Sequence, residues 1–392
     1  DFSSSGTVAG RNLVKIGADN IRNMGGISAG TLALQATKDI DNIGGTLKAQ
    51  NAALLSAGRD LNLTSTTQSS SNTVGANSFS QTGIDRVAGL YVSGPAGVLL
   101  ASAGNNINLT AAQIHNAGTG LTQLNAGNDL NLSAVNASVS QRVVWDADNR
   151  QSQSASMDVG SQVKGAGNLV LNAGQDINAK AAAVSAGQTL TVAAGRDVNI
   201  LAGQATQSLD EAHKHTSKGF MSKTTVATHD QQESTTALGS SLEGGSVNVV
   251  AGRDLTVKGS SIVADQNLSL DAARNLSVLS AEDTATSSNS TQVKKSGLSG
   301  GYASGNLSVG YGKSTTSTQS NNASVTQHES TIGALNGSAR LKSGETLQVV
   351  ASDVAAKENL TLIGKNVDLS AAQNTSDNQQ SASSKSSGFS VG

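Results

Sequence analysis

One short phrase recurs along the whole chain and constrains the fold more than any other feature. It reads Ala-Gly-x-Asp/Asn-apolar-x-apolar, and four of its copies begin at Ala57, Ala126, Ala194 and Ala251. The residues that these copies repeat are Gly58, Asp60, Leu61, Leu63, Gly127, Asp129, Leu130, Leu132, Gly195, Asp197, Val198, Gly252, Asp254 and Leu255. Self-similarity at a fixed period is typical of stacked-repeat architectures.

The spacing between copies gives the size of one repeat. Ile177 and Val198 are 21 residues apart, and a second apolar series lies 8 residues earlier, as Leu169 does before Ile177. One repeat therefore contains at least two short strands, each a Leu-x-Leu unit that directs both apolar side chains to one face. Gly is expected at a corner with positive φ, and Asp or Asn there is expected to hydrogen-bond its own backbone.

Strands this short are stable only when each pairs with the same strand one repeat later. The pattern therefore predicts an all-β fold, a parallel β-helix whose Leu, Ile and Val side chains form columns inside a tube. Helical solenoids have longer periods and 3.6-residue patterning, and propeller blades need about 40 residues with aromatic signatures. The chain has only four Phe, three Tyr and one Trp.

Composition narrows the classes of function. The net charge is −2, and the sequence shows no basic cluster that would indicate a nucleic-acid phosphate track. Cys is absent, so disulfides and thiolate metal sites are excluded. The uncharged stretch 87–104 is interrupted by glycines and Pro95, which argues against a membrane-spanning helix.

Polar segments without the 21-residue period separate groups of coils. The expected coils are 1–63, 102–133, 166–204, 244–283 and 341–373, and the expected inserts are 64–101 (with a coil-like end), 134–165, 205–243, 284–340 and the start of a truncated insert at 374–392. In 284–340, residues 290–296 are roughly mirrored by 313–318, which predicts a hairpin that turns near Gly305-Asn306. We expect the inserts to leave the tube as two-stranded ribbons that pack against each other, because an isolated ribbon is only marginally stable. Both ends of the chain look cut, as in a fragment of a longer protein.

These coils and inserts resemble a known family. Ala-Gly-Arg-Asp-Leu coils that alternate with inserts carrying Lys-Lys-Ser-Gly-Leu (294–298) and Gly-Tyr-Gly-Lys-Ser (310–314) resemble the haemagglutinin repeats of filamentous haemagglutinins and of contact-dependent growth inhibition toxins. The resemblance covers essentially all 392 residues. The combination of coils and inserts looks most like the second, more C-terminal repeat region of such proteins.

The resemblance implies a right-handed β-helical filament of a Gram-negative bacterium. Such a filament is exported through an outer-membrane two-partner secretion transporter and displayed at the cell surface. The repeat region would act as a stalk that helps a C-terminal toxin to reach or cross the outer membrane of a target cell, or that meets a surface receptor there. The alternative within the family is an adhesin filament that mediates attachment.

An alternative of another class is a carbohydrate-active β-helix enzyme. Such an enzyme places non-repeating carboxylates around one groove, whereas the Asp residues of the repeat phrase recur at one corner and often follow an Arg. A charge-compensated ladder is therefore expected in place of a catalytic pair. The calcium-binding nonapeptide of β-helices is absent, and His213-Lys214-His215, near Asp210, Glu211 and His229, is interpreted as a solvated ribbon edge. No cofactor, metal or small-molecule substrate is predicted.

Two features remain candidates for contact with a membrane or a partner. The segment 307–312 alternates apolar and small residues, as a lipid-facing strand does, and the other candidate is the single Trp of the chain. The candidate contact residues are Trp145, Tyr302, Leu307, Val309 and Tyr311.

Overall fold

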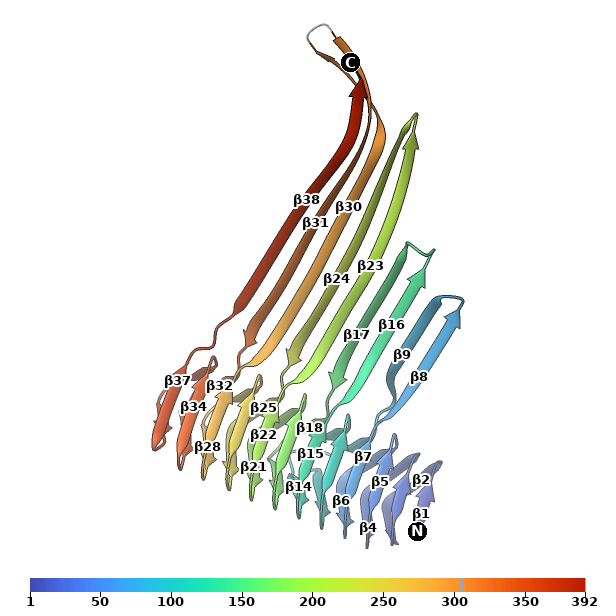
Figure 1. The fold of residues 1–392 in the computed structure, drawn as a ribbon. Helices are drawn as coiled ribbons and strands as arrows, with labels where there is room; N and C mark the ends of the chain where they lie inside the picture. The colour runs from blue at the N-terminus through green and yellow to red at the C-terminus, as the bar shows by residue number, and fades with distance from the viewer. Residues whose placement is uncertain (304–305, 392) are drawn as a thin grey trace.

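The computed structural model describes residues 1–303 and 306–391, with the side chains of all of them except 299, 302, 303, 306 and 307. Every regular element among these residues is a β-strand. Short strands form a row of stacked coils, and long hairpins rise from one side of the row (Figure 1). The tip of the 284–340 hairpin, expected near Gly305-Asn306, lies outside the described residues.

The first of three sheets runs the length of the stack. In the described chain it consists of β1 (Phe2–Ser4), β3 (Ile21–Asn23), β5 (Ile40–Ile43), β7 (Leu61–Thr64), β12 (Ile107–Thr110), β15 (Leu130–Ser133), β20 (Ile177–Lys180), β22 (Val198–Leu201), β26 (Leu255–Lys258), β29 (Leu276–Leu279), β34 (Thr346–Val350) and β37 (Asn366–Ser370). All of its pairings are parallel and in register. Ile177, for example, lies between Leu130 of the preceding coil and Val198 of the following one.

The second sheet forms the rest of each coil. Within the described residues it consists of β2 (Thr7–Ala18), β4 (Gly26–Ala36), β6 (Thr46–Ala57), β10 (Gly89–Val92), β11 (Val98–Ala103), β13 (Gln113–Asn116), β14 (Thr122–Ala126), β18 (Gln162–Gly165), β19 (Leu169–Ala173), β21 (Ala183–Ala194), β25 (Ser241–Ala251), β27 (Ser261–Ala264), β28 (Leu268–Ala272), β32 (Thr331–Ala334), β33 (Ala339–Ser343), β35 (Asp353–Ala356) and β36 (Leu360–Ile363). It contains two parallel ladders that share several strands. In β6, for example, residues 46–49 pair with β10 in one ladder, and residues 52–57 pair with β11 in the other.

The third sheet is antiparallel and is built from the inserts. Its described strands are β8 (Thr66–Val74), β9 (Asn77–Arg86), β16 (Val135–Val144), β17 (Arg150–Val159), β23 (Gly203–Gly219), β24 (Ser222–Leu238), β30 (Ala281–Ala303), β31 (Asn306–His328) and β38 (Thr375–Val391). We call it the hairpin sheet. The mirrored polar segments pair as the sequence indicates, with Ser290 opposite Gln319 and Ser296 opposite Lys313.

Each coil has three strand positions, one more than the two that the sequence reveals. The additional position comes first in the coil, as in β18, β27 and β32. Each of these strands presents only one large buried apolar side chain, such as Val163 or Ile332, so it leaves no Leu-x-Leu signature. For this reason the expected inserts 134–165, 205–243 and 284–340 include the first strand of the next coil. The hairpin strands themselves end at 159, 238 and 328.

The core of the coils consists of columns of like side chains. In the first sheet one column contains Ile21, Ile40, Leu61, Ile107, Leu130, Ile177, Val198, Leu255, Leu276 and Leu347, all at most 1% exposed. Neighbours in this column are also partners in the parallel ladder. The apolar positions of the repeat phrase therefore build the interior.

The glycine of the repeat phrase does not adopt the positive φ that the sequence suggests. Positive φ among the described glycines occurs at Gly44, Gly75 and Gly259, none of which belongs to the phrase. A Cβ on Gly127 would instead lie 2.0 Å from the carbonyl oxygen of Gly104 in the preceding coil. Gly is required because successive coils approach too closely for a side chain.

The Asp or Asn of the phrase also acts between coils, not on its own backbone. Oδ1 of Asp176 accepts a hydrogen bond from the backbone N–H of Asp197 at 3.1 Å, and Oδ1 of Asp197 accepts one from the N–H of Asp254 at 3.2 Å. The same bond recurs from Asp39 to Asn275, with the acceptors Asp39, Asp60, Asn106, Asp129, Asp176, Asp197 and Asp254. The Asx ladder is thus continuous through the coils from Asp39 to Asn275.

Arginines neutralise the carboxylates of the ladder, as the sequence pattern predicts. Arg196 donates from Nε to Asp176 at 2.7 Å, and its Nη2 also bonds that carboxylate. Arg253 pairs likewise with Asp197, and Arg274 with Asp254. The Arg196 hydrogen bond lowers the pKa of Asp176, and the Arg274 hydrogen bond lowers that of Asp254. The carboxylates of Asp176 and Asp254 are therefore held ionised, each in an ion pair between two coils.

Candidate functional surface: the hairpin sheet

The hairpins leave the stack at one corner, between the third strand of one coil and the first strand of the next. They follow β7, β15, β22, β29 and β37. The coils between them turn the same corner in one residue with positive φ, which is Gly44, Ala111, Ala181, Gly259 or Ala351. From β5 onward, hairpin and tight corner alternate strictly along the described chain.

This alternation explains why the hairpins form one sheet. A hairpin contributes two strands, which occupy about twice the 4.8 Å strand spacing of a sheet. Two coils rise along the stack by the same amount, since their strands are also sheet neighbours. One hairpin for every two coils therefore fills the hairpin sheet without gaps, in the order β8, β9, β16, β17, β23, β24, β30, β31, β38. The expectation that the ribbons pack against each other is confirmed, and they do so edge to edge (Figure 1).

Buried serines close the base of the hairpins. Ser240 and Ser330 each lie two residues after the returning strand of a hairpin and are at most 1% exposed. Ser240 donates its hydroxyl to the carbonyl of Leu201, the last residue of the coil strand β22, at 2.7 Å. Ser330 does the same to Leu279 at 2.6 Å. The hydroxyl thus joins the point where the chain leaves the coil to the point where it returns.

Hydroxyl and amide side chains hold neighbouring hairpins together. Ser154 and Ser208 are 2.7 Å apart across the second and third hairpins, and Ser80 and Ser140 are 2.8 Å apart across the first and second. These bonds join rows that are in register across strands. The polar side chains of the inserts therefore serve to pair strands of one sheet.

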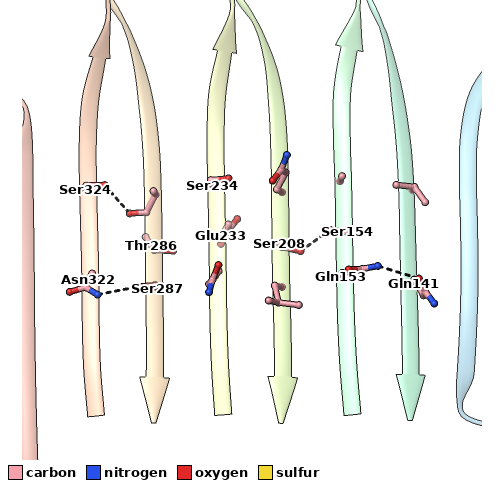
Figure 2. Close-up of a pocket in the computed structure, with 16 residues that line it drawn as sticks. Gln141, Gln153, Ser154, Ser208, Glu233, Ser234, Thr286, Ser287, Asn322 and Ser324 are labelled. Carbon is pink, nitrogen blue, oxygen red and sulfur yellow. Dashed lines mark hydrogen bonds between the residues drawn. The ribbon is translucent and has the colours of Figure 1, made fainter. Parts of the chain in front are cut away.

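A shallow groove of about 680 Å³ crosses the middle hairpins. Figure 2 shows its lining of Gln, Ser, Thr and Asn side chains, among them Gln141, Gln153 and Asn322. Gln153 donates to Gln141 at 3.2 Å, and Asn322 donates to Ser287 at 3.1 Å. Each of these bonds joins the two strands of one hairpin, and the groove itself runs from the second hairpin across the third to the fourth.

A charged cluster lies between the tip of the second hairpin and the third hairpin. Lys214 donates to Asp148 at 2.8 Å, and Asp210 contacts His229 at 3.3 Å. Hydrogen bonds from Gln231 and then His229 lower the pKa of Asp210. Within the part of the chain that the structure describes, no group of three or more His, Asp or Glu side chains could hold a metal ion. The cluster fastens the third hairpin to the second.

The candidate contact residues occupy the distal parts of the hairpins. Trp145 is 58% exposed at the tip of the second hairpin, where its ring lies 5.6 Å from that of His213. Val309 and Tyr311 are exposed on β31. The side chains of Tyr302 and Leu307 lie outside the described residues, so their role stays a prediction.

Sequence reasoning missed other exposed apolar residues at the distal ends. Phe220 is 95% exposed in the turn after β23, and Phe389 and Val391 are each 70% exposed near the end of β38. Each stands alone in a polar segment, without a periodic signal. Only the strand register shows that Phe389 lies beside Tyr311.

The described residues contain no helix long and apolar enough to cross a membrane. The uncharged stretch 87–104 forms β10 and β11, which belong to the coils.

The model of one protein family, described as "Hemagglutinin repeat", matches residues 22–150, 145–228 and 221–388. Among curated relatives, the chain is 28% identical over 389 residues to "tRNA nuclease CdiA-2" of Burkholderia pseudomallei (strain 1026b), covering 98% of this chain and 12% of that protein. It is 32% identical over 389 residues to "Deoxyribonuclease CdiA" of Dickeya dadantii (strain 3937), covering 97% of this chain and 11% of that protein. It is also 30% identical over 232 residues to "16S rRNA endonuclease CdiA" of Enterobacter cloacae, covering 59% and 7%. The chain thus spans about an eighth or less of the length of these relatives. No solved structure matches it.

Proposed function

Because the chain belongs to the hemagglutinin-repeat family, we propose that it is a stalk segment of a secreted toxin-delivery filament of contact-dependent growth inhibition. The observation that carries the proposal is the match of nearly the whole chain to CdiA proteins, in a region that is a small fraction of their length. A stack of coils with nearest-neighbour contacts suits a long, stiff spacer.

The role is structural and not enzymatic. The three relatives are named for action on tRNA, DNA and 16S rRNA, yet this chain is similar to all three. Because these nucleases act on different substrates, a region that all three share does not determine which substrate is cleaved. In addition, Glu233 is the single carboxylate among the described residues that line the groove, whereas glycoside hydrolysis uses a pair.

The coils would form a right-handed parallel β-helix. Their parallel ladders at coil spacing support this architecture, and connections between parallel strands of one sheet are right-handed in about 98% of cases. The filament would be secreted by a Gram-negative bacterium through an outer-membrane two-partner secretion transporter. Its partner would be the target-cell outer membrane or a receptor on it.

The test is an in-frame replacement of hairpin residues 204–237 by a two-residue Asn-Gly turn in the full-length secreted protein. Inhibitor cells that carry this variant should display the filament, as detected by antibody on whole cells, but should lose growth inhibition of target cells. Cells that lack the toxin end of the filament provide the control for loss of inhibition with normal display. Unchanged inhibition would contradict a delivery role of the hairpin sheet. Loss of target-cell attachment alone, with inhibition restored by forced contact, would favour an adhesin.

A further inference from the structure

The hairpin sheet brings together lysines that are far apart in the sequence. Lys218 of β23 lies opposite Lys223 of β24, and the same row continues through Ser296 of β30 to Lys313 of β31. Two residues closer to the coils, a second row contains Lys294 of β30 and Lys385 of β38.

All five lysines are on one face of the sheet. Side chains alternate between faces along a strand, and cross-strand partners share a face. The pairings run without a register shift through both rows. We call this surface the lysine face and define it by Lys218, Lys223, Lys294, Lys313 and Lys385, each of which is exposed.

The charge of the lysine face is not compensated locally. Residues 213–228, 291–318 and 381–391, which form the distal parts of these strands, contain no Asp or Glu. Among the described residues none of the five lysines has an ion pair at 4 Å or less. Lys218 and Lys223 also face each other directly, and like charges in that position destabilise a sheet. The fold retains this arrangement at a cost in stability.

Apolar side chains continue the same face toward the tip. Beyond the lysines lies a row of Leu298, Tyr311 and Phe389, followed by Val309 opposite Val391. Their exposed fractions range from 36% for Tyr311 to 70% for Phe389. The opposite face of the sheet carries Gly297, Gly312 and Gly388 at this height. The face that is cationic near the middle of the hairpins is therefore apolar at their ends.

We infer that the lysine face docks on an anionic lipid surface, with its ammonium groups at the level of the lipid phosphates and the apolar rows in the acyl region. This inference rests on the proposed function for its setting at a target-cell membrane. Cationic and apolar groups in this order match a headgroup layer above hydrocarbon, and interfacial elements bury apolar side chains about 5–10 Å into that boundary. Successive rows on one face are about 6.8 Å apart, so the row of Tyr311 reaches this depth when Lys313 is at the phosphates.

The geometry indicates that the ends of the hairpins insert into one leaflet and do not span the bilayer. A transmembrane strand needs about 9–11 residues. Residues 306–312 are all that β31 has beyond Lys313. The strand is thus too short to cross the hydrocarbon core with Lys313 at the phosphates.

The test is flotation of the 392-residue chain with lipid vesicles of phosphatidylcholine alone or of an equal mixture with phosphatidylglycerol. We expect binding to the mixed vesicles and loss of binding on going from about 0.1 M to about 1 M salt, where the Debye length falls from about 10 Å to about 3 Å. Each lysine near an anionic surface strengthens binding about fivefold. The variant with Lys218, Lys223, Lys294 and Lys313 replaced by Gln should therefore bind at least about 100-fold more weakly.

A matched control makes the same change of net charge on the coils. Lys15, Lys48, Lys164 and Lys258 are exposed coil lysines, and their replacement by Gln should change binding by less than about threefold, because they are distant from the lysine face. Neither variant should melt below the parent, since every replaced side chain is exposed and the change on the lysine face removes the repulsion between Lys218 and Lys223. An equal loss in the two variants would overturn the inference.

Insertion is measured with the variant Trp145→Phe, Tyr311→Trp, which places the single Trp on the apolar row. Nitroxide-labelled acyl chains should quench its fluorescence in mixed vesicles, and absence of quenching would overturn the inference. Equal binding to both kinds of vesicle, unaffected by the lysine changes, would also overturn it but leave membrane association intact. Preferential binding of duplex DNA over mixed vesicles at the same salt concentration would assign the lysine face to nucleic acid.

Discussion

Replacing Leu276 by Ala tests whether the columns of the coils are the source of their stability. Leu276 lies between Leu255 of the preceding coil and Leu347 of the following one, and all three are fully buried. The backbone ladders fix these neighbours about 4.8 Å away on both sides, so the cavity left by Ala cannot collapse. Leu→Ala substitutions at such sites cost about 3–5 kcal/mol.

The effect should be local, because each coil contacts only its neighbours. A loss of about 3 kcal/mol corresponds to roughly 100-fold faster amide hydrogen exchange, which we expect in β26, β29 and β34. Exchange in β3 and β5, at the other end of the stack, should not change. Hydrogen exchange followed by mass spectrometry of peptides resolves these segments.

The matched control is Leu54→Ala on β6, because Leu54 is 39% exposed on the outside of a coil. It should cost about 0.5 kcal/mol or less. Equal effects of the two substitutions would refute the argument from burial. A uniform acceleration along the whole chain would refute the argument from nearest-neighbour coupling.

Four further predictions address other parts of the fold. Gly127→Ala should lower the thermal midpoint by several degrees, because its Cβ would lie 2.0 Å from a carbonyl oxygen of the preceding coil; Gly6→Ala, with nothing within 4 Å, should not. The pKa of Asp176 is lowered in the folded state mainly by its hydrogen bond from Arg196, so its stabilising effect is present above the unfolded pKa of about 3.9 and is lost as the pH falls through the folded pKa. Thermal melts should therefore show Asp176→Asn to be less stable than the parent at pH 7, with the difference shrinking below about pH 4. Ser330→Ala leaves the carbonyl of Leu279 and an amide without their partner, and should cost about 1–3 kcal/mol in denaturant titrations. Replacing residues 204–237 by a two-residue turn should make 135–159 sensitive to protease, because β17 loses its neighbour β23.

The fold of the coils could be predicted because its signals are local. The 21-residue period and the Leu-x-Leu units lie within a few residues of each other, and each repeats many times. The hairpin of 281–328 could be found for the same reason, since its two strands mirror each other around one turn. The first strand of each coil escaped because one large apolar residue, such as Val163, makes no pattern.

The lysine face could not be predicted, because its residues meet only through pairing between different hairpins. Lys223 and Lys313 are 90 residues apart in the sequence, and neither belongs to a run of charge that exceeds two residues. Their meeting requires both the strand order of the hairpin sheet and its register. The linear sequence therefore shows no basic cluster, whereas the folded surface gathers five lysines on the lysine face.

The reasons for Gly and Asp in the repeat phrase were also beyond a local reading. Both residue types favour turns, which suggested a role within one corner. In the structure Gly127 and Asp176 instead act on the neighbouring coil, the one by close approach and the other by accepting its amide. A repeated contact between coils leaves the same trace in the sequence as a repeated turn.

Because hairpins and tight corners alternate, the spacing of the strands in the hairpin sheet does not depend on the length of those strands. The base of the hairpin sheet is fixed by the rise of the coils, so the spacing of its strands is set independently of their length. Strand length can therefore increase along the stack, from 9 residues in β8 to 23 in β30, without disturbing the coils. The third and fourth hairpins and β38 extend beyond the first two hairpins, and it is there that the lysine face and the apolar rows occur. A stalk built in this way can hold a contact surface away from its own axis while each hairpin remains paired along its base.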